Sequence, residues 1–271
     1  MAAVSSLINE TFGFWGTITA TIDWCESNYD ISYFVAEFWN TLSNIAIIAP
    51  AILGAIRCWQ CNIEKRIILA FVLLSFVGLG SWCFHMTLLY EMQLLDEIPM
   101  VAVSMVSISS LLSSLQVSCK NSLLVEVLLT LTLVAFTLIY VLVKTPILFQ
   151  LSYAAMVFGI IYVDLLILKR HPSNKKLLTL GLSLYGCGVV FWLCDNIFCD
   201  NLRELRQLLP SFIAPLTQFH SLWHIFAGFG AYIQVLLCLR SHVLSKYKLA
   251  DVSLKYGFVE IKQLKSYQNG H

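Results

Sequence analysis

Charge is scarce in this chain of 271 residues. Charged side chains make up 12 % of the sequence, about half of the quarter that is usual for a soluble domain, whereas hydrophobic residues make up 58 %. The formal balance of 17 basic and 16 acidic residues leaves +1, so the basic surplus typical of nucleic-acid-binding proteins is absent. So much apolar surface must be buried, which excludes a disordered chain. We therefore expect no nucleic-acid partner and a protein that lies in a lipid bilayer.

Basic residues are also missing from the first 34 positions. A cleavable signal peptide begins with a basic region, so we expect none here. Farther along, seven apolar runs have the roughly 20 residues that cross a hydrocarbon core, and their continuity favours helices over barrel strands. The prediction is an all-α fold, a bundle of seven transmembrane helices between residues 35 and 239. The expected spans lie near residues 35–56, 67–90, 97–117, 122–143, 146–168, 177–198 and 215–239.

The basic residues are divided unequally between the two sides of this bundle. If the spans alternate in direction, the side with the N-terminus holds 3 of the 17 Lys and Arg residues, and the other side holds the remaining 14. Because basic loops stay in the cytosol, we expect residues 1–34 to form a lumenal or external segment and residues 240–271 a cytosolic tail. The glycosylation sequon Asn9-Glu10-Thr11 lies on the expected outer side.

Three histidines stand in apolar surroundings. His220 and His224 are four residues apart at the beginning of the last span, so they share one face of a helix, and His85 lies near the end of the second span. These two spans run in opposite directions, which brings all three to the same membrane depth. A helix pair of histidines can be structural, but three histidines and an open position are typical of catalytic zinc. Iron and copper accept the same ligands.

Two polar residues accompany His85. Asp96 begins the third expected span, where a carboxylate can be a solvated helix start favoured by the helix dipole, or a base beside a metal. Ser81 lies four residues before His85 on the same helix face. Its hydroxyl can bond its own backbone, or it can donate a hydrogen bond to an oxyanion. Asp195, near the outer end of the sixth span, is an intramembrane carboxylate and hence another functional candidate.

The N-terminal segment carries an acidic cluster that admits two interpretations. Oxygen ligands at short spacing suit calcium, whereas a solvated acidic face needs no ion. The stretch is not an EF-hand, because Asn28 stands at the sixth position from Asp23, where that loop requires glycine. The cluster consists of Asp23, Glu26, Asn28, Asp30 and Glu37.

Cysteines fall on both expected sides of the membrane. Cys58 and Cys61 form a C-x-x-C pair in an expected cytosolic loop, where two reduced thiols are the simpler interpretation. Cys25 and Cys199 both fall on the outer side, where an oxidising compartment permits a disulfide, and the residues alone leave their pairing open.

Six segments together resemble the alkaline ceramidases, particularly the branch that also accepts phytoceramide. They run in order along residues 13–240 and are DWCESN at 23–28, AEFWNT at 36–41, GSWCFHMTL at 80–88, EMQLLDE at 91–97, DNIFC at 195–199 and TQFHSLWH at 217–224.

This resemblance implies an intramembrane zinc amidase that takes ceramide from the bilayer and hydrolyses its N-acyl bond, giving a sphingoid base and a fatty acid. Phytoceramide and dihydroceramide types are implied as substrates, calcium as a stimulating cofactor, and the endoplasmic reticulum or Golgi membrane as the location. No obligate protein partner is implied. The implied site residues are His85, His220 and His224 for zinc, Ser81 and Asp96 for catalysis, Asp23, Trp24 (through its carbonyl), Glu26, Asn28 and Glu37 for calcium, and Cys25 with Cys199 as a disulfide.

Two other classes stay open. Seven-helix receptors of the adiponectin and progestin type carry a similar histidine and aspartate zinc site. Their N-terminus is expected in the cytosol, opposite to the charge distribution here, and they lack the DWCESN segment. A transporter with Asp96 and Asp195 on a proton path explains neither the three histidines nor that segment.

Overall fold

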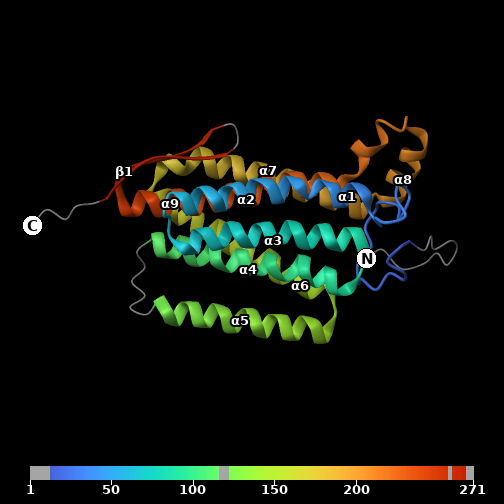
Figure 1. Cartoon of the computed structure of the whole chain (residues 1–271), viewed down its shortest axis with the longest axis horizontal. Helices are drawn as coiled ribbons and strands as arrows, with labels where there is room; N and C mark the ends of the chain where they lie inside the picture. Colours follow the sequence, from blue (N-terminus) through green and yellow to red (C-terminus); the bar gives the residue numbers. More distant parts are fainter. Residues whose placement is uncertain (1–12, 116–121, 256–257, 267–271) are drawn as a thin grey trace, which may run out of the picture.

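The computed structural model describes residues 13–115, 122–255 and 258–266, so the sequon at Asn9 lies outside the described part (Figure 1). Helices dominate the chain up to residue 246. The elements are α1 (Phe38–Ser43), α2 (Ile45–Gln60), α3 (Lys65–Thr87), α4 (Tyr90–Ser114), α5 (Ser122–Val143), α6 (Pro146–Arg170), η1 (Pro172–Asn174), α7 (Lys175–Ile197), α8 (Cys199–Leu208), η2 (Ala214–Thr217), α9 (Phe219–Lys246), β1 (Tyr247–Lys255) and β2 (Phe258–Ser266).

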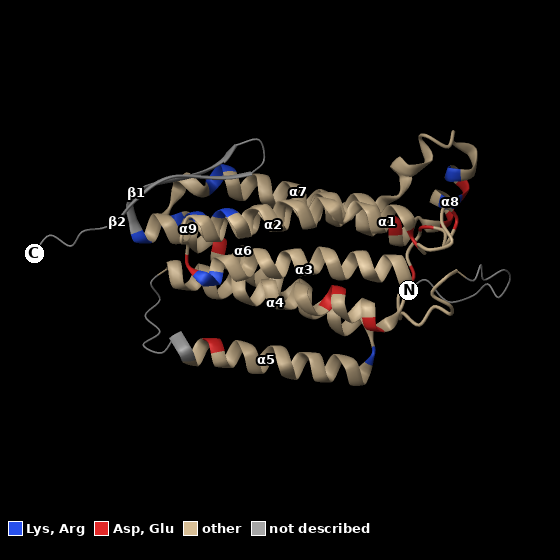
Figure 2. Ribbon diagram, in the orientation of Figure 1, with Lys and Arg blue, Asp and Glu red and all other residues tan. Residues whose placement is uncertain are grey.

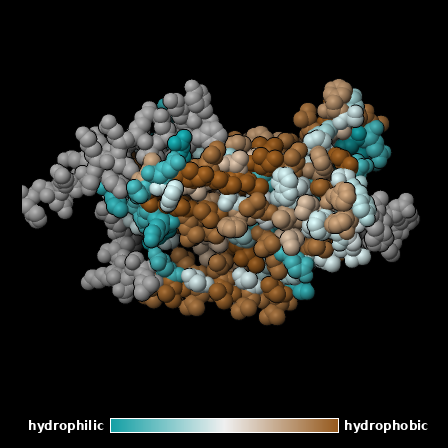
Figure 3. All heavy atoms as spheres, in the orientation of Figure 1, coloured by the Kyte–Doolittle hydropathy of each residue, from teal (hydrophilic) through white to brown (hydrophobic). Residues whose placement is uncertain are grey.

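Seven helical stretches in the described residues are long and apolar enough to cross a membrane, with α1 and α2 counted as one, which confirms the predicted seven-helix bundle. They run along the long axis of the molecule (Figure 1). Their outer faces carry large apolar side chains such as Leu142, 81 % exposed, and Phe158, 71 % exposed. Figure 3 shows this apolar belt in brown. Water would penalise such a surface and lipid would not, so the chain is a multi-pass membrane protein.

Several helix boundaries differ from the predicted ones. α4 begins at Tyr90, seven residues before the expected start at 97, because Leu88 ends α3 in a left-handed conformation (φ 52°) and the turn needs only Leu88 and Leu89. α9 continues to Lys246, past the expected end at 239. Pro215 lies in η2, before α9 rather than inside it.

Helix α9 is the central element of the bundle, with buried residues along most of its length. Small residues let α7 approach it closely. A Cβ atom at Gly188 would lie 2.8 Å from the backbone nitrogen of Ala227, and one at Gly230 would lie 2.8 Å from Cβ of Tyr185. By contrast, α5 lies at the edge of the bundle beside α4, and little of it is buried.

Strands β1 and β2 form an antiparallel pair after α9, in register around Val252 and Ile261. The sequence predicts only helices and a tail without assigned structure there. The all-helical description therefore holds for the membrane bundle, and the C-terminal segment adds a small two-stranded sheet to it.

The two ends of the bundle differ in charge, as Figure 2 shows. Basic residues gather at the end that carries β1 and β2, which we call the hairpin end. Examples are Arg57 in the last turn of α2, Lys169 in the last turn of α6 and Lys175 at the start of α7. Most acidic residues gather at the opposite end, many of them around α1 and α8, and we call this end the α8 end.

Candidate active site

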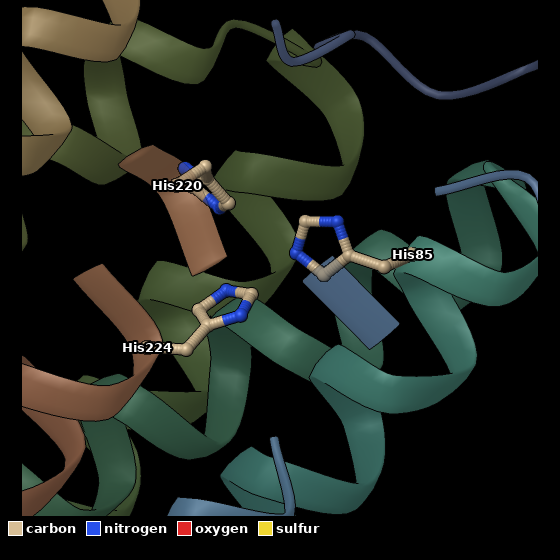
Figure 4. A group of neighbouring side chains, drawn as sticks. All are labelled: His85, His220 and His224. Carbon is tan, nitrogen blue, oxygen red and sulfur yellow. The ribbon is translucent and has the colours of Figure 1, made fainter. Parts of the chain in front are cut away.

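Three buried histidines meet at the α8 end of the bundle. His85 comes from the last turns of α3, and His220 and His224 come from the first turns of α9. One nitrogen from each ring lies within 4.8 Å of the other two, the only such group of three His, Cys, Asp or Glu residues among those the structure describes. Figure 4 shows the three rings turned toward one another. The structure thus brings together the three residues that the sequence placed at one depth.

The hydrogen bonds of two of these rings favour the tautomer that binds a metal. Nδ1 of His224 lies 3.0 Å from the carbonyl oxygen of Asn40. A carbonyl only accepts, so this Nδ1 carries the proton and Nε2 keeps its lone pair. Nδ1 of His85 lies 2.5 Å from Oε2 of Glu37, and its Nε2 is buried without a hydrogen-bond partner in the described part. Metal-binding histidines commonly donate their second N–H to a carboxylate or carbonyl. The donor set therefore fits a zinc ion.

The third ring, that of His220, is held by its surroundings rather than by a bond to its Nδ1, which is buried and has no partner among the described residues. The indole of Trp24 stacks on it with ring centroids 3.8 Å apart. The backbone N–H of His220 donates to Oδ1 of Asp195, 3.2 Å away. Asp195, which the sequence offered as a candidate in its own right, thus lies beside the histidine group as an acceptor for the first turn of α9.

The side chains of Ser81 and Asp96 interact with each other in the same part of the bundle as His85. Ser81 lies one turn before His85 on α3, and Asp96 comes from α4. Because α4 begins at Tyr90, Asp96 stands in the second turn and not at the helix start as expected, so the dipole of the first turn does not account for its position. Gly80 permits the contact: a Cβ there would lie 2.0 Å from the carbonyl oxygen of Leu95. Only glycine lets the two backbones approach this closely.

Sequence reasoning missed a pair of tyrosines near Asp96. The hydroxyl of Tyr185 on α7 donates to that of Tyr153 on α6 at 3.1 Å, and Tyr153 interacts electrostatically with Asp96. Tyrosines within apolar spans are common in helix packing, so nothing in the sequence distinguished these two.

A second buried polar network was also missed. Glu97 accepts hydrogen bonds from the hydroxyl of Tyr140 on α5 and from the side chain of Gln93 at 3.1 Å. Oε1 of Gln93 accepts from the backbone N–H of Thr21 at 2.8 Å. The network joins α5, α4 and the N-terminal segment. The intramembrane carboxylate of Glu97 was a signal that could have found it.

The residues expected to bind calcium lie close to the histidines, but their side chains have different hydrogen-bond partners. The side chain of Asn28 donates to both oxygens of Asp23, and Asp23 contacts Glu37. The carboxylate of Glu26 instead accepts from the backbone N–H groups of Trp39 and Asn40, at the start of α1.

The charges of this acidic cluster are poorly compensated within the described chain. Burial, with the like charge of Glu37, raises the pKa of Glu26 to about 8. Burial also raises the pKa of Glu37 well above its ordinary value. The carbonyl of Trp24, the remaining expected ligand, accepts from the guanidinium of Arg203 at 3.4 Å. Asp30 lies exposed.

Cys25 connects the N-terminal segment to α7 and α8. Its sulfur is bonded to that of Cys199, and its backbone N–H donates to Oδ2 of Asp195 at 3.3 Å. Its carbonyl accepts from Arg206 at 2.7 Å and from Arg203 at 3.2 Å. Cys58 and Cys61 are free; Cys58 lies in the last turn of α2, and Cys61 directly follows that helix. The backbone N–H, the carbonyl and the sulfur of Cys25 are thus all bonded to residues of α7 or α8.

Comparison with known proteins identifies relatives along most of the chain. The family model described as Ceramidase matches residues 16–264. Alkaline ceramidase 3 of Mus musculus is 43 % identical over 235 residues, which cover 86 % of this chain and 87 % of the relative. Alkaline ceramidase YPC1 of Saccharomyces cerevisiae is 30 % identical over 268 residues, with coverage of 91 % and 83 %. Alkaline ceramidase 1 of Homo sapiens is 29 % identical over 220 residues, with coverage of 76 % and 77 %. A match of this extent means that the chain belongs to the alkaline ceramidase family and is a hydrolase.

Proposed function

We propose that this protein hydrolyses the N-acyl bond of ceramides, including phytoceramide and dihydroceramide types, to a sphingoid base and a fatty acid. The observation that carries the proposal is the group of three buried histidines beside the Ser81–Asp96 pair, in a chain of the alkaline ceramidase family. A zinc ion held by His85, His220 and His224 would lower the pKa of water and polarise the amide carbonyl. Burial of the site among membrane helices lets a two-chain lipid reach it without leaving the bilayer.

Asp96 is the proposed general base. Its carboxylate takes a proton from the attacking water and later returns it to the departing amine, the exchange that amide hydrolysis requires. Ser81 has one O–H, which Asp96 engages as long as the carboxylate is ionised. Once Asp96 carries a proton, it can donate to Oγ of Ser81. The Ser81 O–H is then released to donate to the oxyanion that develops on the substrate.

We further propose that calcium binds the acidic cluster and stimulates the reaction. Asp23 contacts both Asn28 and Glu37, and Glu26 and the Trp24 carbonyl lie nearby in the chain. A divalent cation would favour the ionised carboxylates. Glu37 also bonds His85, so an ion bound to Glu37 would influence one of the three histidines directly. The close contact of Trp24 with His220 offers a second route.

The α8 end is proposed to face the lumen, in the endoplasmic reticulum or Golgi membrane. Two observations support this orientation. Basic residues gather at the hairpin end, and such residues are retained in the cytosol. The Cys25–Cys199 disulfide is compatible with an oxidising compartment. Protease added to sealed vesicles with the cytosolic face outward should cleave the C-terminal segment and spare the residues before α1. Cleavage before α1 would reverse the orientation and favour the receptor-type class.

Hydrolysis is tested with the purified full chain and a panel of ceramides, dihydroceramides and phytoceramides, with products followed by mass spectrometry. We expect release of sphingoid base and fatty acid, loss of both with a zinc chelator, and recovery when zinc is returned. A matched sample with Asp96→Asn should retain bound zinc and lose hydrolysis. Full turnover in the chelated, zinc-depleted protein would refute the metal-assisted mechanism, and no turnover of any ceramide would refute the substrate class.

A further inference from the structure

The segment between α7 and α9 protrudes sideways from the α8 end of the bundle (Figure 1). It consists of α8, a turn and η2, and it joins Ile197, the last residue of α7, to Phe219, the first residue of α9. Both flanking helices belong to the candidate membrane spans. The segment therefore lies at the level where the spans leave the membrane, and because it extends beyond the bundle it lies over lipid rather than over other helices.

Three large apolar side chains of this segment are strongly exposed. Leu208 is 83 % exposed, Phe212 is 79 % exposed and Leu216 is 66 % exposed. We call these three residues the apolar crest. Single exposed apolar residues are ordinary, but three within nine positions on a protruding element indicate a surface that something covers. In Figure 3 the protrusion carries brown atoms toward the bundle and teal atoms at its outer edge.

The segment is held in shape by its own hydrogen bonds. The backbone N–H of Ile213 donates to the carbonyl of Pro210 at 2.8 Å, and that of Leu216 donates to the carbonyl of Ile213 at 2.9 Å. Arg206 donates to the carbonyl of Thr217 at 2.9 Å. Leu202 is buried against the rest of the protein. An element whose backbone groups are bonded internally and whose apolar side chains point outward can enter the membrane–water interface at a small free-energy cost.

We propose that the apolar crest inserts into the lipid leaflet at the α8 end and that the segment is an interfacial foot. The residues at which α7 ends and the segment begins are apolar and exposed as well, with Ile197 66 % exposed and Phe198 50 % exposed. Basic attraction to anionic headgroups does not explain the foot. Arg203 and Arg206 both donate to the carbonyl of Cys25 instead, so insertion is driven by apolar burial.

The foot is mechanically connected to the histidine group. Arg206 holds the carbonyl of Cys25, and the neighbouring residue Trp24 stacks on His220. Cys199, at the start of α8, is bonded to Cys25 as well. A displacement of the foot would therefore be transmitted to Trp24 and, through it, to His220.

Site-specific quenching in nanodiscs tests this proposal on the full chain. A fluorescent nitrobenzoxadiazole label is attached at Phe212→Cys, in a background in which every cysteine except Cys25 and Cys199 is serine. Gln207→Cys, an exposed polar position of the same segment, is the matched control. With phosphatidylcholine lipids that carry a nitroxide on the acyl chain, we expect several-fold stronger quenching and a blue-shifted emission at position 212.

Equal quenching at both positions would overturn the proposal, as would a label at 212 that is shielded from water but not quenched, since a protein partner or a second copy would then cover the crest. A second measurement needs no cysteine substitutions. Phe212→Trp in the otherwise unchanged chain should add fluorescence that brominated lipids quench, compared with Gln207→Trp. Absence of any added quenching would contradict insertion independently.

Discussion

The indole ring of Trp24 lies stacked on the imidazole of His220, with ring centroids 3.8 Å apart and an angle of 22° between the planes. A residue of the N-terminal segment therefore forms one wall of the histidine group. The segment is part of the site and not a separate appendage, so a substitution in it can affect the histidines directly.

Removal of one histidine should abolish metal binding. His220→Ala or His224→Ala leaves two ligands, too few for a stable zinc site, so bound zinc should fall to background and ceramide hydrolysis should be lost. Zinc is measured by inductively coupled plasma mass spectrometry. His171→Ala, a change outside the histidine group, is the control and should leave zinc unchanged. Full activity in a His220→Ala, His224→Ala double variant without zinc would exclude the metal mechanism.

Asp23→Asn should change the response to calcium and leave zinc in place. Asp23 contacts Asn28 and Glu37 but none of the three histidines among its described contacts, so its loss removes one charge and weakens calcium alone. The calcium concentration for half-maximal activity should rise, and the thermal stabilisation given by calcium should shrink, because a ligand of the folded state stabilises by mass action.

Glu37→Ala is a less selective test, since the same carboxylate is bonded to His85, and it should lower zinc affinity together with the calcium response. If Asp23→Asn and the unaltered protein show the same calcium dependence, Asp23 is not a calcium ligand and the proposed calcium site is refuted.

Gly80→Ala should separate Ser81 from Asp96. The added Cβ would lie 2.0 Å from the carbonyl oxygen of Leu95, which is backbone and cannot rotate away. Overpacking of this kind costs about 1–3 kcal/mol, and the shift of α4 should lower hydrolysis more than tenfold. Gly186→Ala is the matched control, since a Cβ there meets nothing within 4 Å. It should leave activity unchanged and maintain or raise the melting temperature. Equal effects of the two changes would contradict the close approach.

Asp195→Ala should weaken zinc binding without touching a ring nitrogen. The change leaves the backbone N–H groups of Cys25 and His220 without their acceptor, at a cost of about 1–3 kcal/mol for each group left unsatisfied. The first turn of α9 should loosen, with a lower melting temperature and a higher dissociation constant for zinc. Asp164→Ala removes a buried carboxylate of α6 that bonds Gln234. It should affect stability alone, and an identical loss of zinc in both variants would argue against a positioning role for Asp195.

Hydropathy and spacing predicted the part of the site that depends on single helices. The depth of His85 and the common face of His220 and His224 follow from where the spans begin and end. Contacts between elements could not be predicted from the sequence. The hydrogen bond between Glu37 and His85, for example, depends on how α1 crosses α3. The foot could be predicted only in part. Leu202, Leu205 and Leu208 recur at helical spacing, but the three charged residues among them favour a loop over residues 199–214.

The histidine group is built from both ends of the chain. Trp24 and Glu37 are among the first 40 residues, whereas His220 and His224 belong to the last long helix. A ribosome must therefore synthesise nearly the whole membrane domain before two of the three imidazoles exist, so an ion that needs all three ligands could bind only after α9 has been made. A chain truncated before α9 would also leave the glycine-lined face of α7 without its partner, an unfinished surface of the kind that quality control in a membrane recognises.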